Sequence, residues 1–274
     1  MKNIGTINLV AIDLDGTLYD SKSRISEANR NAIYKCLDNK VKVIITTAKT
    51  VYTVRNLIVE LGLKDPQIAS AGSAIVGSNL EIIYTRKIPV QPYIKAIKLA
   101  RKYKVGICTS CINGNVYVED NAPSLNDIWE SGEIPTMCES LLESQITNNA
   151  LLITFAVHAK NSFNEEVENL LGSEIKLRRA GQNWLTAYSL FAGKMGALKK
   201  ILSMTGIKKK NVLALGDSES DVGMLSLAGI GVAMGNAADK LKEAADYIVS
   251  DNDSDGVAEA IERFVFNNRN QASF

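Results

Sequence analysis

Two pairs of aspartates occupy positions at which carboxylates can do chemistry. In the first pair, Asp13 and Asp15 follow the apolar run Ile7–Ile12, and Gly16 comes directly after them. Side chains alternate along an extended chain, so we expect both carboxylates to point the same way. They repel each other unless a cation or a shared proton intervenes. An Asp-Gly pair alone is an ordinary turn signal, but two acids that end a buried strand favour a ligand site, because α/β sheets bind ligands there.

The second pair, Asp217 and Asp221, follows another apolar run, Asn211–Leu215. A helix that begins near Ser218 would place both acids near its N-terminal end. There they could simply interact with the helix dipole, which is worth a few tenths to about 1 kcal/mol each. Two acidic strand ends on one sheet make a site of oxygen ligands the better interpretation, and such a site suits Mg²⁺.

Strand and helix patterns alternate around these motifs. In the N-terminal part they predict strands over Ile7–Ile12 and Val41–Ile45 and helices over Ser26–Leu37 and Thr50–Leu61. In the C-terminal part they predict helices over Gly193–Leu202, Asp221–Leu227 and Gly256–Phe264, and strands over Asn211–Leu215, Ile230–Ala233 and Tyr247–Val249. This alternation is typical of a doubly wound parallel sheet.

The middle of the chain has a different pattern. It predicts helices over Tyr93–Tyr103 and Phe163–Leu171 and strands over Val105–Thr109, Val116–Glu119, Leu151–His158, Ile175–Arg178 and Trp184–Tyr188. We therefore expect an α+β domain over residues 86–189, inserted into a core made of residues 1–85 and 190–274. The acidic stretch 121–144 gives no clear assignment.

Several motifs of the sequence resemble those of the haloacid dehalogenase superfamily. The run Asp-Leu-Asp-Gly-Thr from Asp13 to Thr17 looks like the superfamily signature. The stretch GDSESDVGML, which begins at Gly216, and the stretch AGIGVAMGNA, which begins at Ala228, look like the Cof-type branch of sugar-phosphate and cofactor phosphatases. The resemblance covers the whole chain, although the insert matches only in size and position. It implies a three-layer doubly wound (Rossmann-like) α/β core with an inserted α+β cap.

The resemblance also implies roles for the four aspartates. Asp13 would be the nucleophile, and Asp15 would protonate the leaving oxygen and then activate water. Asp13, Asp217 and the backbone carbonyl of Asp15 would hold Mg²⁺, with Asp221 close by or bound through water. Two acids in different environments can divide nucleophilic and acid–base roles in this way.

Two phosphate contacts follow from the same resemblance. Thr47 matches a hydroxyl residue that bonds a phosphate oxygen, and Lys194 matches a lysine that neutralises the nucleophile and the phosphate. Lys49 stands where the family usually has arginine, so it keeps the charge but loses the bidentate fork. Ala71, Thr186 and Ser220 also depart from the family pattern, which leaves the substrate undetermined.

Composition and charge narrow the function further. The 274-residue chain is 46% hydrophobic and carries 31 Lys and Arg against 30 Asp and Glu, which does not favour nucleic-acid binding. It has no apolar run long enough to span a membrane and no signal peptide, so we expect a cytoplasmic protein. Cys108 and Cys111 could belong to a zinc site with Cys138 and His158, but ordinary reduced cysteines are the better interpretation.

We therefore expect a Mg²⁺-dependent phosphatase that acts on a small phosphorylated metabolite, a sugar phosphate or similar, through an aspartyl-phosphate intermediate. A phosphomutase with the same intermediate is one alternative. A non-catalytic regulator that binds a phosphorylated metabolite is another, although the intact Asp13, Asp15, Lys194, Asp217 and Asp221 argue against it. The sequence gives no oligomeric state.

Overall fold

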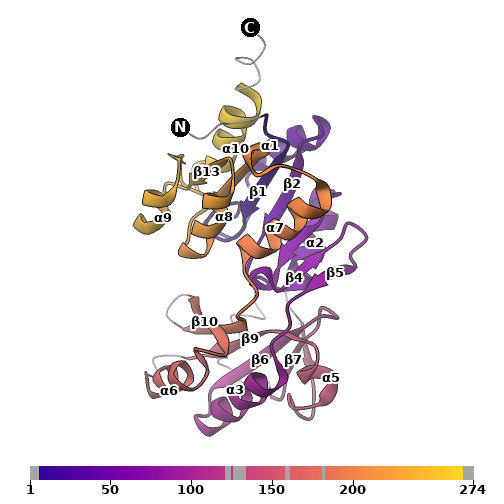
Figure 1. Cartoon of the computed structure of the whole chain (residues 1–274), viewed down its shortest axis with the longest axis vertical. Helices are drawn as coiled ribbons and strands as arrows, with labels where there is room; N and C mark the ends of the chain where they lie inside the picture. The colour runs from indigo at the N-terminus through magenta and orange to yellow at the C-terminus, as the bar shows by residue number, and fades with distance from the viewer. Residues whose placement is uncertain (1–5, 121–124, 126–133, 158–160, 181–182, 268–274) are drawn as a thin grey trace.

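Two β-sheets organise the chain (Figure 1). The computed structural model describes residues 6–120, 125, 134–157, 161–180 and 183–267. The first sheet has the strand order β14-β13-β12-β1-β2-β3-β4-β5, and the second has the order β10-β11-β9-β6-β7-β8. Every strand of the second sheet lies between β5 and α7 in the sequence, so this sheet is an insertion into the first unit.

Fully buried strands form the centre of the first sheet. They are β1 (Leu9–Asp13) and β12 (Val212–Gly216), and they pair in parallel with each other and with β2 (Lys42–Thr46) and β13 (Ile230–Ala233). The remaining strands, nearer the edges, are β3 (Gln67–Ala69), β4 (Ala74–Val76), β5 (Ile82–Thr85) and β14 (Tyr247–Ile248). The observed β1 is shifted by up to two residues from the predicted strand Ile7–Ile12, and the last residue of β1 is Asp13.

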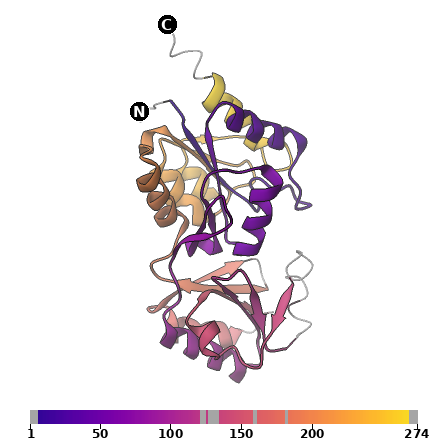
Figure 2. The same ribbon diagram turned by 90° about the vertical axis from the view of Figure 1, so that its right-hand side faces the viewer.

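Helices cover both faces of this sheet (Figure 2), so the core has three layers. They are α1 (Glu27–Asp38), α2 (Val51–Leu61), α7 (Lys194–Thr205), α8 (Val222–Leu227), α9 (Asp239–Ala244) and α10 (Gly256–Ile261). The side chain of Ser26 caps α1, and Gly62 (φ 63°) closes α2, as the sequence predicts. The predicted last helix continues to Asn267 as a π-helical turn, and α9 was not predicted.

Within the described residues, the helices of the second sheet lie on one of its faces. Its strands are β6 (Gly106–Cys111), β7 (Val116–Val118), β8 (Pro135–Met137), β9 (Ala150–Ala156), β10 (Ile175–Ala180) and β11 (Trp184–Ser189). Its helices are α3 (Val90–Lys102), α5 (Ser144–Thr147) and α6 (Asn161–Leu171). α3 and α6 bury their apolar sides against the sheet, and the opposite face of the sheet is turned toward the first unit (Figure 1).

Several predicted elements of the insert have different ends. α3 begins at Val90 and not at Tyr93, because a proline such as Pro92 is tolerated in the first turn of a helix. β8 was not predicted, and it pairs in parallel with β7. His158, Trp129 and half of the acidic stretch 121–144 lie outside the described residues. The insert boundaries at residues 86 and 189 stay a prediction.

The described part of the chain bears on two further alternatives, a zinc site and a membrane-spanning helix. Cys108 and Cys111 belong to different apolar clusters, so their thiols do not converge on one ion. Within the described part of the chain, the only group of acidic, His or Cys side chains that could hold a metal is made of aspartates. No helix in that part has the length and apolar character to cross a bilayer.

Candidate active site

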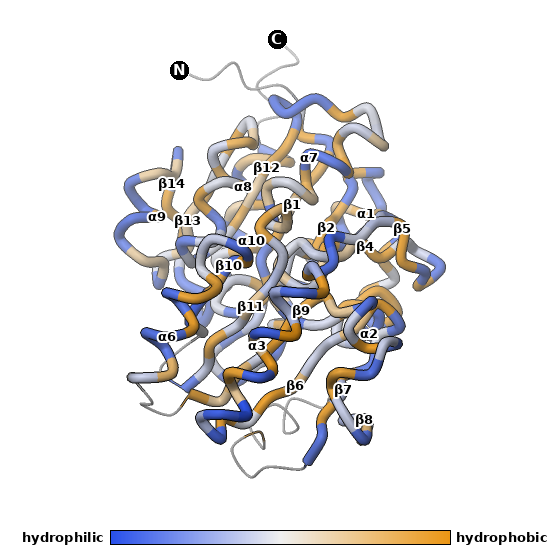
Figure 3. Tube along the Cα trace, turned by 60° about the horizontal axis from the view of Figure 1, so that its bottom comes forward, coloured by the Kyte–Doolittle hydropathy of each residue, from blue (hydrophilic) through white to orange (hydrophobic). Residues whose placement is uncertain are grey.

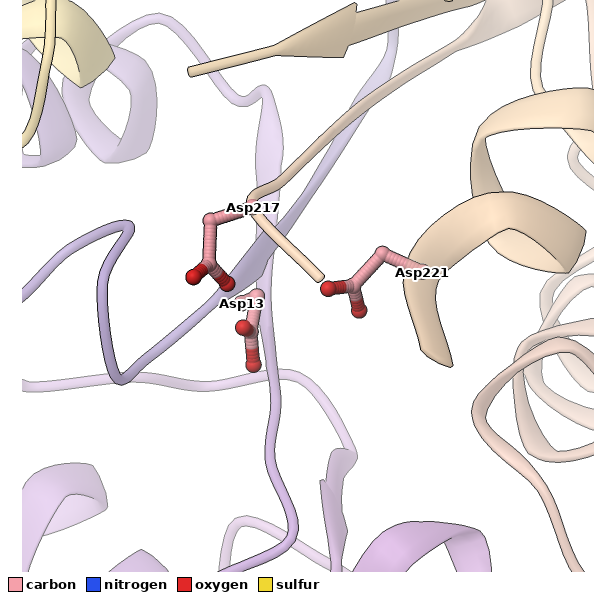
Figure 4. A group of neighbouring side chains, drawn as sticks. All are labelled: Asp13, Asp217 and Asp221. Atoms are coloured by element: carbon pink, nitrogen blue, oxygen red, sulfur yellow. The ribbon is translucent and has the colours of Figure 1, made fainter. Parts of the chain in front are cut away.

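The pairing of β1 with β12 brings the two acidic strand ends together. The strands are parallel neighbours with Ile12 opposite Leu215, so Asp13 and Asp217 leave the sheet at the same edge. Carboxylate oxygens of Asp13, Asp217 and Asp221 lie within 4.8 Å of one another (Figure 4). Three acids in this space indicate a site that accepts a cation.

Lys194 is the buried cation of this cluster. It is the first residue of α7, and only 5% of it is exposed. Its Nζ donates to Asp13 Oδ1 at 2.5 Å and to Asp221 Oδ1 at 2.7 Å. The predicted convergence of Lys194 on Asp13 is therefore present in the structure, while the second contact, with Asp221, was not predicted.

Protein donors occupy both oxygens of Asp221. Oδ1 accepts from Lys194, and Oδ2 accepts from the Ser218 hydroxyl at 2.8 Å and from the Ser218 backbone N–H at 3.1 Å. Ser218 and Asp221 form a capping box at the turn after β12. Asp221 is thus placed to orient Lys194. The sequence signal for this box was a serine followed three residues later by an acid, and sequence analysis missed it.

Burial sets the electrostatics of the cluster. Burial, together with the negative charge of Asp221, holds the pKa of Asp13 well above its ordinary value. The pKa of Asp217 is raised as well, chiefly by burial and secondarily by Asp221. Burial alone would lower the pKa of Lys194, but the charges of Asp13 and Asp221 outweigh it and raise that pKa. The lysine therefore stays protonated, and the two acids favour a proton or a cation between them.

The carboxylates of Asp13 and Asp217 fit a divalent cation. Burial and the charge of Asp221 raise the pKa of both carboxyl groups, so a cation or a proton between them is favoured. Lys194 bonds Asp13 and Asp221, so within the described residues Asp217 has no bonded cation. A hard cation would satisfy the oxygens of both groups.

Asp15, Lys49 and Thr47 lie beside the cluster and not within it. The Asp15 side chain is 56% exposed and pairs with Lys49 at 3.3 Å. Thr47 is fully buried, and its Oγ1 accepts from the Lys49 backbone N–H at 3.0 Å. The exposed carboxyl of Asp15 and the buried one of Asp13 thus occupy the different environments that a division of roles requires.

Gly16 packs directly against the cluster. Its φ is +74°, and a Cβ at this position would lie 2.4 Å from Asp217 Oδ2. Gly16→Ala should therefore displace the Asp217 carboxylate in addition to straining the backbone. We expect kcat/KM to fall by more than about tenfold, since a misplaced catalytic group costs up to about a hundredfold.

Gly62→Ala is the matched control for this prediction, because Gly62 also has a positive φ (+63°) but no atom within 4 Å of its Cβ position. It should lose only about 1–2 kcal/mol of stability, the cost of a left-handed alanine, and keep its activity. Kinetics and thermal unfolding of both variants provide the measurement. Equal activity losses in the two would show that the contact with Asp217 is unimportant.

A cavity of about 390 Å³ opens next to Lys194. Lys194, Gly193 and Ser220 line one side of it, and Lys176, Arg178 and Tyr188 of the second sheet line another. Sequence analysis left these three cap residues unassigned because nothing in the pattern shows which face of the cap is open. A larger cavity of about 700 Å³ lies at the amino end of β2, and its described lining contains no residue of the acidic cluster.

Comparisons with known proteins give matches that cover most of the chain. A model of the haloacid dehalogenase-like hydrolases matches residues 10–261. A 5-amino-6-(5-phospho-D-ribitylamino)uracil phosphatase of Bacillus subtilis is 35% identical over 261 residues, which are 94% of this chain and 96% of that protein. A phosphoglycolate phosphatase of Methanobrevibacter smithii is 30% identical over 94% of this chain and 99% of its own. The crystal structure of a haloacid dehalogenase-like hydrolase from Bacteroides thetaiotaomicron superposes with a TM-score of 0.87 at 27% identity, over 94% of this chain and 99% of that one.

Proposed function

Because the chain belongs to the haloacid dehalogenase-like hydrolases and is a phosphatase of that family, we propose that it hydrolyses the phosphomonoester of a small metabolite, such as a sugar phosphate, through an aspartyl-phosphate intermediate on Asp13. The observation that carries the proposal is the 2.5 Å contact of Lys194 with Asp13 inside a buried acidic cluster. A carboxylate attacks a phosphate only where nearby positive charge offsets the repulsion.

Asp13 carries out the first chemical step. The Asp13 oxygen that Lys194 does not hold attacks phosphorus, and the bond from phosphorus to the leaving oxygen breaks. Asp15 gives its proton to that oxygen. Lys194 holds the other Asp13 oxygen and so orients the attacking one. In the second step Asp15 takes a proton from water, which attacks phosphorus and regenerates Asp13 with release of inorganic phosphate. Thr47 and Lys49 are proposed to bond the phosphate oxygens.

Asp13 and Asp217, with the Asp15 carbonyl, would hold Mg²⁺, and Asp221 would act through Lys194 or through a bound water. When bound, the ion supplies positive charge that offsets the phosphate and the carboxylates. Support comes from the three converging aspartates and from the burial of Asp13 and Asp217, which favours a cation between their carboxylates. The family's general use of a divalent ion is consistent with this ligand set.

The covalent intermediate can be tested by trapping. Rapid acid quenching during turnover of a good phosphate ester should give protein that is heavier by one phosphoryl group. Peptide mass spectrometry should place that group on Asp13. Protein that stays unmodified during turnover, or a phosphoryl group on another residue, would contradict the intermediate.

Removal of the metal is expected to abolish activity and lower the melting temperature. If Mg²⁺ binds only the folded state, it stabilises that state by about 2.7 kcal/mol when its free concentration is a hundred times its Kd. We expect Mg²⁺ to raise the Tm of the wild type but not that of Asp217→Asn, which removes a charged ligand. Ca²⁺ should support turnover poorly, because its larger and looser coordination changes the geometry of attack. Full turnover in EDTA, or an equal shift of Tm in both proteins, would exclude this site.

A further inference from the structure

Two cations of the cap, Lys176 and Arg178, lie on the side of the second sheet that faces the catalytic core. Side chains alternate along β10, and Ile175 and Leu177 pack into the apolar interior beneath α3 and α6. Lys176 and Arg178 therefore point the other way. In the register of the sheet Lys176 is opposite Tyr188. This face of the sheet thus presents two positive charges and a phenol to the core.

The partners of both cations are neutral. Lys176 Nζ donates to the Ala192 carbonyl, and Arg178 Nη2 donates to the Ser218 hydroxyl at 3.1 Å. Within the described part of the chain, neither has a carboxylate at ion-pair distance. On the helical side of the cap three cations are paired with acids: Lys95 with Glu174 at 2.7 Å, Lys102 with Glu166 at 2.9 Å, and Arg101 with Glu119. The two cations that face the core thus lack the counter-charge that the other side of the cap supplies.

Both cations share the cavity of Lys194. Lys176, Arg178 and Tyr188 line the same space of about 390 Å³ as Lys194. Burial raises the pKa of Tyr188, and the charges of Arg178 and Lys194 both oppose that shift, so the phenol lies within range of both. A space of this size holds a small metabolite. Lys194 of the proposed phosphate site and two unneutralised cations therefore line one cavity.

We propose that the substrate is a phosphate ester whose leaving group carries a second anionic group, a carboxylate or a phosphate, bound by Lys176 and Arg178. This inference rests on the proposed phosphatase activity and adds the substrate class. Arg178 is half-buried and can present two parallel donors to a planar carboxylate or a phosphate. Lys176 is a half-buried point charge, and burial lowers its pKa, so an anion beside it would stabilise the charged form.

The contacts with Ala192 and Ser218 suggest a competing role, in which the two cations only hold the cap against the core. The two roles differ in what they discriminate. A cap contact acts on every phosphate ester alike. An anion subsite acts only on esters with the second charge. Matched substrate pairs separate the two roles: phosphoglycolate against ethyl phosphate for a carboxylate, and fructose bisphosphate against fructose monophosphate for a phosphate.

The test measures kcat/KM for the four esters with the wild type, Lys176→Met and Arg178→Gln. Lys199→Met is the control, because Lys199 is an exposed lysine of α7. The wild type should prefer the doubly anionic member of at least one pair. Each cap variant should reduce that preference by about tenfold to a hundredfold, the value of a hydrogen bond to a charged group. Ethyl phosphate turnover should change by less than about threefold, and the control should match the wild type.

A binding measurement separates this inference from the phosphatase proposal. Calorimetric titration of Asp13→Asn protein with phosphoglycolate and with ethyl phosphate needs no turnover. Loss of the phosphoglycolate preference when Lys176→Met is added supports the subsite, even if the wild type hydrolyses none of the four esters. Wild-type protein that binds and hydrolyses both members of each pair equally overturns the subsite, as does an equal loss for all four esters in the cap variants.

Discussion

Asp13→Asn is expected to reduce turnover by at least about 10⁴-fold. Losses of this size occur when the nucleophile is removed from a set of catalytic residues that act together. The amide cannot form an acyl phosphate, and no other carboxylate of the cluster has the same hydrogen-bond contacts as Asp13. Asp217 lacks the contact with Lys194, and both oxygens of Asp221 are held by protein donors. Steady-state kinetics with a generic ester would measure the loss.

The same substitution should leave the fold intact. Asn replaces a buried acid whose charged form is disfavoured by burial and by Asp221, so the free energy of unfolding in EDTA should stay level or increase. Asp239→Asn is a suitable control, because Asp239 is an exposed acid on α9. It should behave as the wild type in both measurements. Near wild-type turnover in Asp13→Asn would refute the assignment of the nucleophile.

Lys194→Met is expected to damage both activity and stability. The methionine cannot neutralise the phosphate or orient Asp13, so kcat/KM should fall by about 10²–10³-fold, as when a key charge-stabilising donor is removed. The substitution also leaves Asp13 and Asp221 buried without their shared cation. Removing one partner of a buried ion pair costs about 3–5 kcal/mol, which chemical unfolding in EDTA would measure.

A second substitution tests the cause of that instability. In Lys194→Met/Asp221→Asn one of the two stranded charges is gone, so part of the lost stability should return while activity stays low. Asp221→Asn in the wild-type background should itself be destabilising, because Lys194 and Ser218 both bond the carboxylate. Two substitutions whose stability effects simply add would show that the charges of Lys194 and Asp221 are not coupled.

The strand ends could be predicted because burial leaves a clear pattern. β1, β2, β12 and β13 are apolar runs, and the acids that follow β1 and β12 stand out against them. Strands β3, β4 and β5 were not predicted, since β3 and β4 are only three residues long and β5 is partly exposed. Short strands are fixed by their neighbours more than by their own sequence.

The contacts of the site were harder to predict than its members. Lys194 and Asp221 were both identified, but their ion pair depends on where α7 begins relative to the turn after β12. The pairing of Lys49 with Asp15 likewise depends on how two separate loops approach each other. Lys176 and Arg178 gave no signal, because the alternation along β10 does not reveal which face of the cap meets the core.

The position of β1 in the first sheet has a consequence for how the protein is made. Leu9 pairs with Val212, so the central strand finds one of its neighbours only after most of the chain has been synthesised. The strands of the second sheet pair among themselves within residues 106–189, and that unit can fold first. The long-range parallel pairing of β1 with β12 is slow to form. A nascent chain therefore carries Asp13 long before Lys194 and Asp217 join it, and the centre is assembled in the last stage of folding.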